Sequence, residues 1–512
     1  MLFNSYGFLF VFLPLTFAGF FWIGRSSDRL AAWWLTLASL TFYGWWDWRF
    51  VPLLVGSIAF NYVAGMTIAR NAGRPRKRWF VLAIAANLLL LAWFKYANLL
   101  LSSFDALAGT RYGPLDIVLP LGISFFTFTQ IAYLADVYQQ RAREARPVYY
   151  ALFVSYFPHL IAGPILHHKE MMPQFAERRT YRLQPNSVLL GAAIFAIGLA
   201  KKVLIADNLA PYANAVFASP MHPSVFVAWG GVLAYAFQIY FDFSGYSDMA
   251  IGLSRLFGIR LPLNFDSPYK SRNIIDFWRR WHMTLSRFLR DYLYFPLGGN
   301  RHGPLRRYLN LMITMLLGGL WHGAGWNFAI WGGLHGLFLS INHLWRRWFG
   351  DGEARTLLGR VASVALTFAA VNVAWVFFRA PDVATGRDIL LGMFGAFGVG
   401  VPDALALRFP GVRRLLESLG VQLFLGGGRQ FMMTYSWILL AGAIAFLAPN
   451  TQQITARFRP ALVTSSAAQI GSRLRLRLRL RLNWQWAAGL GLLTAASLLS
   501  LSRPTEFLYF QF

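Results

Sequence analysis

The chain has 512 residues, of which 56% are hydrophobic and only 13% charged, and its mean hydropathy is +0.44. This composition is typical of a polytopic membrane protein and excludes a set of soluble domains, while the lack of cysteine excludes disulfide and thiolate chemistry. The net charge of +27 could indicate nucleic-acid binding, but basic cytoplasmic loops explain it better, and we expect no nucleic-acid partner.

Apolar segments without Lys, Arg, Asp or Glu recur along the whole chain. A helix needs about 20 mostly apolar residues to cross the hydrocarbon, so the pattern predicts an all-α protein with roughly ten to twelve transmembrane helices. We treat residues 1–512 as a single domain that also holds re-entrant and interfacial helices. The clearest segments are residues 1–24, 30–46, 50–69, 80–94, 117–135, 183–200, 361–378, 430–456 and 482–502.

The basic residues of the N-terminal region fall on one side of the membrane. Loops 25–29 and 70–78 share that side, and 141–146 returns to it after two further crossings, whereas the opposite side carries only Arg49 in this region. Because cytoplasmic loops carry an excess of Lys and Arg, the pattern predicts a periplasmic N-terminus in a bacterial inner membrane.

The first polar cluster within an apolar segment is QIYFDFSGYSDMAIG, residues 238–252. Acidic residues inside a membrane segment indicate proton or ion coupling, or buried partners for arginines. Both alternatives apply to Asp242 and Asp248. We take Gln238 and Asp242 as candidate tunnel residues.

The second cluster is FWRRWHMTLSRFLRDYLYFPLGGNRHG, residues 277–303. Its aromatic and aliphatic residues recur at spacings of three and four, which predicts one apolar helical face. His282 lies beside that face and should point inward, near Ser286. The face comprises Trp278, Trp281, Leu285, Phe288 and Tyr292.

Three arginines of this segment point away from the apolar face. Arg279, Arg287 and Arg290 are compatible with an interfacial helix whose side chains reach lipid headgroups. They are equally compatible with a basic collar that attracts a phosphorylated donor while His282 faces a cavity.

Residues 308–345 contain no Lys, Arg, Asp or Glu. As one helix they would extend for ~57 Å, nearly twice the hydrocarbon thickness, so they should form two membrane segments with a break. Irregular backbone at membrane depth persists only inside protein or beside a water-filled cavity. The break is marked by Gly318, Gly319, Gly323 and Gly325.

His322 lies in that break, between Trp321 and Gly323. Trp321 and Trp326 could wall a pocket around it. A functional histidine and a histidine hydrogen-bonded between helices are about equally compatible with the pattern. His335 and His343 favour the interhelical role. His322 and His335 are thirteen positions apart, with no nearby carboxylate and no HxxxH pair, which predicts no metal site.

The C-terminal part differs from the rest in composition. Residues 401–429 are mixed and Gly-rich, which is typical of a loop with interfacial pieces. In SRLRLRLRLRLNW, residues 472–484, arginine alternates with leucine, which favours an extended basic segment at the lipid surface. We regard about 400–485 as a variable region and about 115–345 as the motif core.

The two histidine-containing motifs, WRRWHMTLSRFLRDYLYFPLGGN and WHGAGWNFAIWGGLHG, resemble the membrane-bound O-acyltransferase (MBOAT) family, most nearly its bacterial alginate O-acetylase branch. The similarity extends to MLFNSYGFLFVFLPLTF, FPHLIAGPI, NFDSPYKSRNIIDFWRRWH and the ending EFLYFQF. It covers most of residues 1–345 and the extreme C-terminus. One departure is His167-His168, where the family pattern after GPI leads us to expect an arginine, and this leaves the acceptor open.

The resemblance implies a catalytic role for His322 and places His282 near a tunnel between two funnels. It implies acetyl transfer from a cytoplasmic thioester, acetyl-CoA being the expected donor substrate, with no tightly bound cofactor. Imidazole, with an ordinary pKa of about 6.5, can take the proton of an attacking hydroxyl. No GxSxG serine motif occurs, so modifying an external polymer should need a periplasmic or membrane-anchored partner with a Ser-His-Asp site.

Two other functions stay open at this point. Within the family, the chain could transfer D-alanyl or another acyl group to a cell-wall polymer, although the long C-terminal region argues against this. From another class, a proton-coupled transporter or flippase could use His322 and Asp242 as a relay. The missing internal repeat argues against a transporter.

Overall fold

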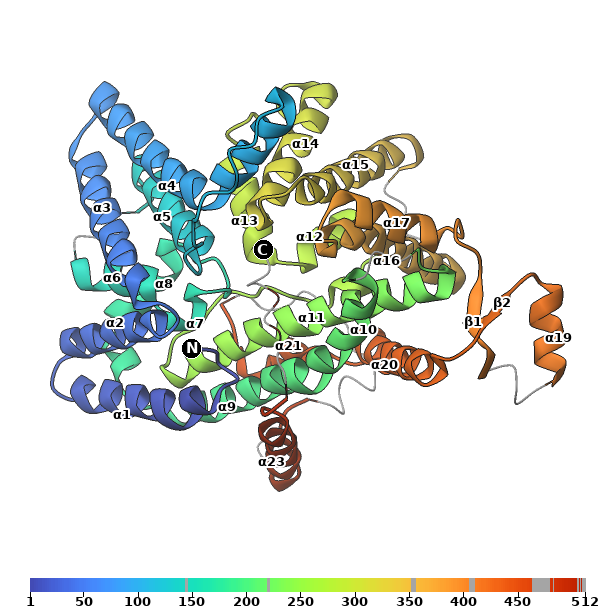
Figure 1. The fold of residues 1–512 in the computed structure, drawn as a ribbon. Helices are drawn as coiled ribbons and strands as arrows, with labels where there is room; N and C mark the ends of the chain where they lie inside the picture. Colours follow the sequence, from blue (N-terminus) through green and yellow to red (C-terminus); the bar gives the residue numbers. More distant parts are fainter. Residues whose placement is uncertain are drawn as a thin grey trace.

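The computed structural model describes residues 1–142, 146–218, 222–350, 356–404, 410–462, 479–481, 483–503, 506 and 508. These residues are almost entirely helical (Figure 1). The first part of the chain contains η1 (Phe8–Phe12), α1 (Leu13–Gly24), α2 (Asp28–Gly44), η2 (Trp48–Phe50), α3 (Val51–Arg70), α4 (Gly73–Ala108), α5 (Ile123–Tyr138), α6 (Pro147–Ser155), α7 (Phe157–Leu160), α8 (His168–Ala176) and η3 (Arg178–Tyr181).

The middle of the chain carries the two histidine motifs. It contains α9 (Pro185–Ala200), η4 (Lys201–Ala206), α10 (Asp207–Phe217), α11 (Val225–Leu256), η5 (Pro268–Lys270), α12 (Ile274–Arg280), α13 (Met283–Leu289), η6 (Arg290–Tyr294), α14 (Gly303–His322) and α15 (Trp326–Phe349).

The last part adds helices around the middle ones and a short sheet. It contains α16 (Leu357–Arg379), α17 (Val383–Met393), β1 (Gly400–Pro402), α19 (Pro410–Ser418), β2 (Gln422–Phe424), α20 (Gly428–Leu447), α21 (Thr451–Ile454), η7 (Ala456–Phe458) and α23 (Trp484–Leu499). Strands β1 and β2 pair in parallel, and they project with α19 from one end of the molecule (Figure 1).

Helix α11 forms the centre of the molecule, and nearly every side chain from Ala228 to Arg255 is buried. It packs tightly along α9 because glycines face each other. A Cβ on Gly252 would lie 2.7 Å from the carbonyl oxygen of Gly191, and one on Gly245 would lie 2.8 Å from that of Gly198. Small residues at such contacts let helix backbones approach closely, as is usual between helices in membranes.

The all-α, multi-span class is confirmed. In the described part of the chain, six helical stretches are long and apolar enough to cross a membrane: 48–70, 73–108, 185–217, 225–256, 357–379 and 428–447. Other apolar segments of the sequence form shorter helices, such as α2, α5 and α23. The sequence therefore contains more apolar segments than the described part of the structure contains helices of sufficient length and hydropathy to cross a membrane.

The C-terminal region, about 400–485, is described in part. The described residues of 401–429 form more regular structure than the expected loop, since they include α19, β2 and part of β1. Most of the alternating Arg/Leu segment, including Arg473, Arg475 and Arg477, lies outside the described residues.

Candidate functional site

The predicted break within residues 308–345 is confirmed. Helix α14 ends at His322 and α15 begins at Trp326. The glycines here serve contact between these two helices: a Cβ on Gly319 would overlap the carbonyl oxygen of Phe328, and one on Gly323 would overlap the Phe328 ring. The tight crossing holds His322 at the end of a rigid helix.

The continuous helical face expected from Trp278 to Tyr292 is wrong, because the helix is interrupted at Trp281 and His282. Helix α12 stops at Arg280, and His282 adopts a left-handed backbone conformation with φ of 42° before α13 starts. The apolar periodicity continues across this kink, so the sequence does not reveal it. The Asn264 carboxamide supports the kink, since its Oδ1 accepts bonds from Thr284 Oγ1 (2.9 Å) and His282 Nδ1 (3.1 Å).

The kink turns His282 into the interior, where its side chain is fully buried beside His322. The two imidazole centroids are 6.2 Å apart. Because His282 Nδ1 donates to Asn264, the lone pair of this ring is on Nε2. Three further rings pack around His322: Trp321 at 4.8 Å, Trp331 at 5.1 Å and Phe378 at 5.1 Å.

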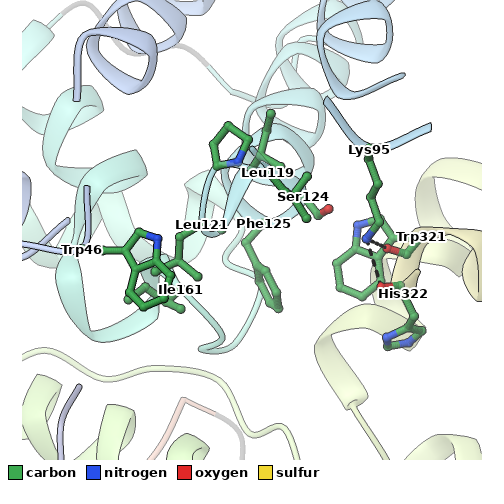
Figure 2. A pocket seen from close by; sticks show the side chains of 12 residues that line it. Trp46, Lys95, Leu119, Leu121, Ser124, Phe125, Ile161, Trp321 and His322 are labelled. Carbon is green, nitrogen blue, oxygen red and sulfur yellow. Dashed lines mark hydrogen bonds between the residues drawn. The ribbon is translucent and has the colours of Figure 1, made fainter. Parts of the chain in front are cut away.

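His322 borders two cavities. The first, which we call the α5 cavity, has a volume of about 130 Å³ and lies between the start of α5, α4 and the end of α14. Figure 2 shows Trp321, Lys95 and Ser124 around it, with the Lys95 side chain reaching from α4 to the end of α14.

The second space, the central cavity, is about 10 Å³, roughly the room for one water molecule. His322, Trp281 and Asp242 line it together with Phe243, Trp375 and Phe378. Leu508 also lines it, so this residue, close to the end of the sequence, contacts the same space as His322.

The three predicted arginines do come together. Arg279, Arg287 and Arg290 line a third space of about 600 Å³, the basic cavity, with Ser286 and a fourth arginine, Arg307. His322 does not line this cavity. Met283 and Thr284 do, and they directly follow His282 in the chain. The basic cavity therefore comes close to the histidine pair through the residues after His282, whereas the α5 cavity is bordered by His322 itself, and the two cavities share no lining residue.

The arginines of the basic cavity differ in their ion pairs. Arg287 holds Glu170 with two bonds of 2.5 and 2.9 Å, and Arg290 pairs with Asp291 at 2.7 Å. Arg279 is exposed and has no ion pair to a described residue.

Two predicted site residues lie elsewhere. Trp326 does not wall the pocket: as the first residue of α15 it points outward and is 62% exposed. Trp331, one and a half turns further along α15, occupies that place instead. Gln238 is buried one turn before Asp242 but lines none of the three cavities.

The two acidic residues of α11 have lysine partners and not the arginines considered above. Asp242 pairs with Lys202 at 2.6 Å, and Asp248 pairs with Lys201 at 2.6 Å. Lys202 also donates to Asp207 and to the Glu506 carbonyl. This buried pair thus connects α11 to the C-terminal segment.

The other histidines have neighbours that suit structural roles. Trp278 Nε1 donates to His335 Nδ1 at 3.3 Å, and Arg307 contacts the ring of His343. His167 lies 3.1 Å from the Tyr292 hydroxyl, which bonds Asp136. Burial, with the nearby charge of Arg287, lowers the pKa of His167 to about 4. Among the described residues no group of three or more metal-ligating side chains occurs.

Sequence reasoning missed four residues that surround the site: Lys95, Arg307, Trp331 and Trp375. The only available signal was Lys95, a lone cation in an apolar segment. The arrangement combines two buried imidazoles, closely packed aromatic rings and a cation-lined cavity. It is suited to proton transfer during attack on an acyl group carried by an anionic donor.

A multi-span helical protein with such a histidine pair has the features of a membrane acyltransferase, and comparison with known proteins agrees. The model of "MBOAT, membrane-bound O-acyltransferase family" matches residues 142–379. Peptidoglycan O-acetyltransferase of Helicobacter pylori is 46% identical over 78% of this chain and 81% of its own length. The probable alginate O-acetylase AlgI of Azotobacter vinelandii is 44% identical over 78% of this chain and 79% of its own length.

A more distant relative, teichoic acid D-alanyltransferase of Bacillus subtilis, is 26% identical over 46% of this chain and 62% of its own. The chain belongs to the MBOAT family and is an acyltransferase. Family membership thus decides against the transporter alternative.

Proposed function

We propose that the protein transfers an acetyl group from acetyl-CoA to a hydroxyl acceptor, for O-acetylation of an exopolysaccharide such as alginate. The observation that carries this proposal is the position of His322. Its imidazole is 6.2 Å from that of His282, whose chain neighbours Met283 and Thr284 line the basic cavity, and it borders the α5 cavity itself.

In this proposal the phosphates of the donor bind at the basic cavity, where Arg279, Arg290 and Arg307 supply positive charge. The thioester end passes Met283 and Thr284 toward the histidines. The acceptor hydroxyl enters from the α5 cavity. His322 takes its proton, the oxygen attacks the acyl carbon, the carbon–sulfur bond breaks, and the thiol of CoA leaves with a proton.

Acetyl is favoured over D-alanyl because both acetylases named above share 44–46% identity with this chain, against 26% for the D-alanyltransferase. The two acetylases are named for different polymers, peptidoglycan and alginate, and both polymers offer sugar hydroxyls as acceptors. We further propose that a periplasmic or membrane-anchored partner with a Ser-His-Asp site completes the transfer.

Acceptor-dependent release of CoA from acetyl-CoA by the purified protein tests the proposal. His322→Ala and His322→Gln should bind the donor but lose transfer by about 10²–10⁴-fold, the usual contribution of a general base. His222→Gln, at an exposed position next to Asp388, is the control and should keep full activity. An active His322→Gln enzyme would show that His322 only bonds between helices.

A further inference from the structure

Lys95 is the only charged residue between Arg78 and Asp105, a stretch that forms most of the long membrane helix α4. Burying a charged side chain inside a membrane segment costs free energy, so such a side chain normally has bonding partners and a functional role. No described carboxylate lies within ion-pair distance of Lys95, so its partners must be of another kind.

Its partners are backbone carbonyls at the end of α14. Lys95 Nζ donates to the carbonyl oxygens of Trp321 (2.5 Å) and His322 (3.0 Å), as the dashed lines in Figure 2 show. The neighbouring Tyr96 hydroxyl donates to the carbonyl of Leu320 at 2.8 Å. Two consecutive residues of α4 therefore hold the last three residues of α14.

These bonds complete the C-terminal end of α14. A helix leaves its last four carbonyls without partners inside the helix. Here the fourth, that of Gly319, accepts from the Gly323 N–H at 3.4 Å, and α4 satisfies the other three. A positive charge at a helix C-terminus also interacts favourably with the helix dipole.

The imidazole of His322 has no hydrogen bond to a described side chain, so its direction depends on ring packing and on where the backbone of α14 ends. We propose that Lys95 is a positioning residue, which fixes the end of α14 and thereby holds the His322 imidazole between the α5 cavity and the central cavity. This inference rests on the proposed role of His322 as base.

Lys95→Met tests the inference, because methionine suits an apolar helix but cannot donate. Misplacing a reacting group by about 1 Å can lower the rate ~10²-fold, so we expect kcat to fall ~10–100-fold while KM for acetyl-CoA stays within about twofold. A rise in KM with unchanged kcat would overturn the inference, since Lys95 would then contact substrate.

Asn87→Leu is the matched control. Asn87 lies two turns before Lys95 on α4 and exchanges hydrogen bonds of 2.7 and 3.1 Å with Asn61 of α3. Its loss should lower the Tm by a few degrees but leave kcat near normal. An equal loss of kcat in both variants would mean that Lys95 only stabilises α4, and would contradict the inference.

The double variant separates this inference from the proposed function. If Lys95 acts through His322, adding Lys95→Met to His322→Ala should not lower the residual rate further. A further drop would overturn the positioning role. An inactive His322→Gln with a fully active Lys95→Met would remove the positioning role alone, whereas an active His322→Gln would remove both.

Discussion

At the residue scale, the arginines of the basic cavity are unequal. Arg287 is committed to Glu170 through two short bonds, and Arg290 pairs with its neighbour Asp291. Arg279 is exposed and borders the same cavity. A guanidinium that is not held by a carboxylate can bind an incoming phosphate without first breaking an ion pair.

We therefore expect Arg279→Gln to raise KM for acetyl-CoA about 2–5-fold with little change in kcat, which is the range for an exposed charge contact. The effect should be larger at low salt, where the field of the arginine is less screened. Arg387→Gln on α17, outside the basic cavity and paired with Asp388, is the control. Steady-state kinetics of the two variants at two ionic strengths give KM and kcat. A loss of kcat with unchanged KM in Arg279→Gln would contradict donor binding by Arg279.

At the element scale, the crossing of α14 and α15 sets the position of His322. Gly332 and Gly333 are adjacent on α15 but face different surroundings. A Cβ on Gly332 would overlap the carbonyl oxygen of Met315, whereas one on Gly333 would meet Leu316 Cδ2 at 3.6 Å, an ordinary contact.

Gly332→Ala should separate the two helices and destabilise the protein by about 1–3 kcal/mol, as overpacking does. Activity should fall with it, since Trp331 and His322 move apart. Gly333→Ala should instead stabilise α15 by ~0.5–1 kcal/mol, because alanine loses less backbone entropy. Thermal unfolding of both variants in one detergent measures the difference, and equal Tm values would refute the role of Gly332.

Comparison of the two histidine motifs shows what the sequence could predict. Glycines and the excessive apolar length indicated the break after His322, and the spacing of Arg279, Arg287 and Arg290 indicated their common direction. The kink at His282 was hidden because Trp278, Trp281 and Leu285 keep helical spacing across it. The side of α15 that faces the pocket depends on the helix rotation after the break, which is why Trp326 was chosen and Trp331 missed.

At the scale of the whole molecule, contacts between distant segments decide the site. Lys95 meets residues 226 and 227 positions later in the chain, and Lys202 meets Glu506 at a separation of 304. Periodicity within one segment carries no information on such pairs. The all-α class, the membrane location and the family motifs could therefore be predicted, and so could Trp321 beside His322, but neighbours from distant segments such as Lys95 and Trp375 could not.

Two other long-range contacts relate the predicted basic loop 70–78, which in the structure joins α3 to the first turns of α4, to the basic cavity. Arg76 donates to the carbonyl of Val137 at the end of α5, and the adjacent Asp136 accepts a bond from Tyr292, two residues after Arg290. The α5 cavity lies at the opposite end of α5, ~24 Å away for a helix of 16 residues. If loop 70–78 is cytoplasmic, the basic cavity lies near the cytoplasm, where acetyl-CoA is made, and the α5 cavity lies nearer the periplasm.

The absence of cysteine allows a direct test of this orientation in the full-length protein. Lys77 lies in the second turn of the 36-residue helix α4 and Arg111 lies just past its other end, and both are exposed. In cells with a permeabilised outer membrane, a membrane-impermeant maleimide should label Arg111→Cys and leave Lys77→Cys unlabelled until the inner membrane is broken. The acyltransferase activity of each variant serves as the control for native insertion. Labelling of Lys77→Cys while the inner membrane is unbroken would reverse the orientation. The basic cavity would then face away from the compartment that holds its proposed donor.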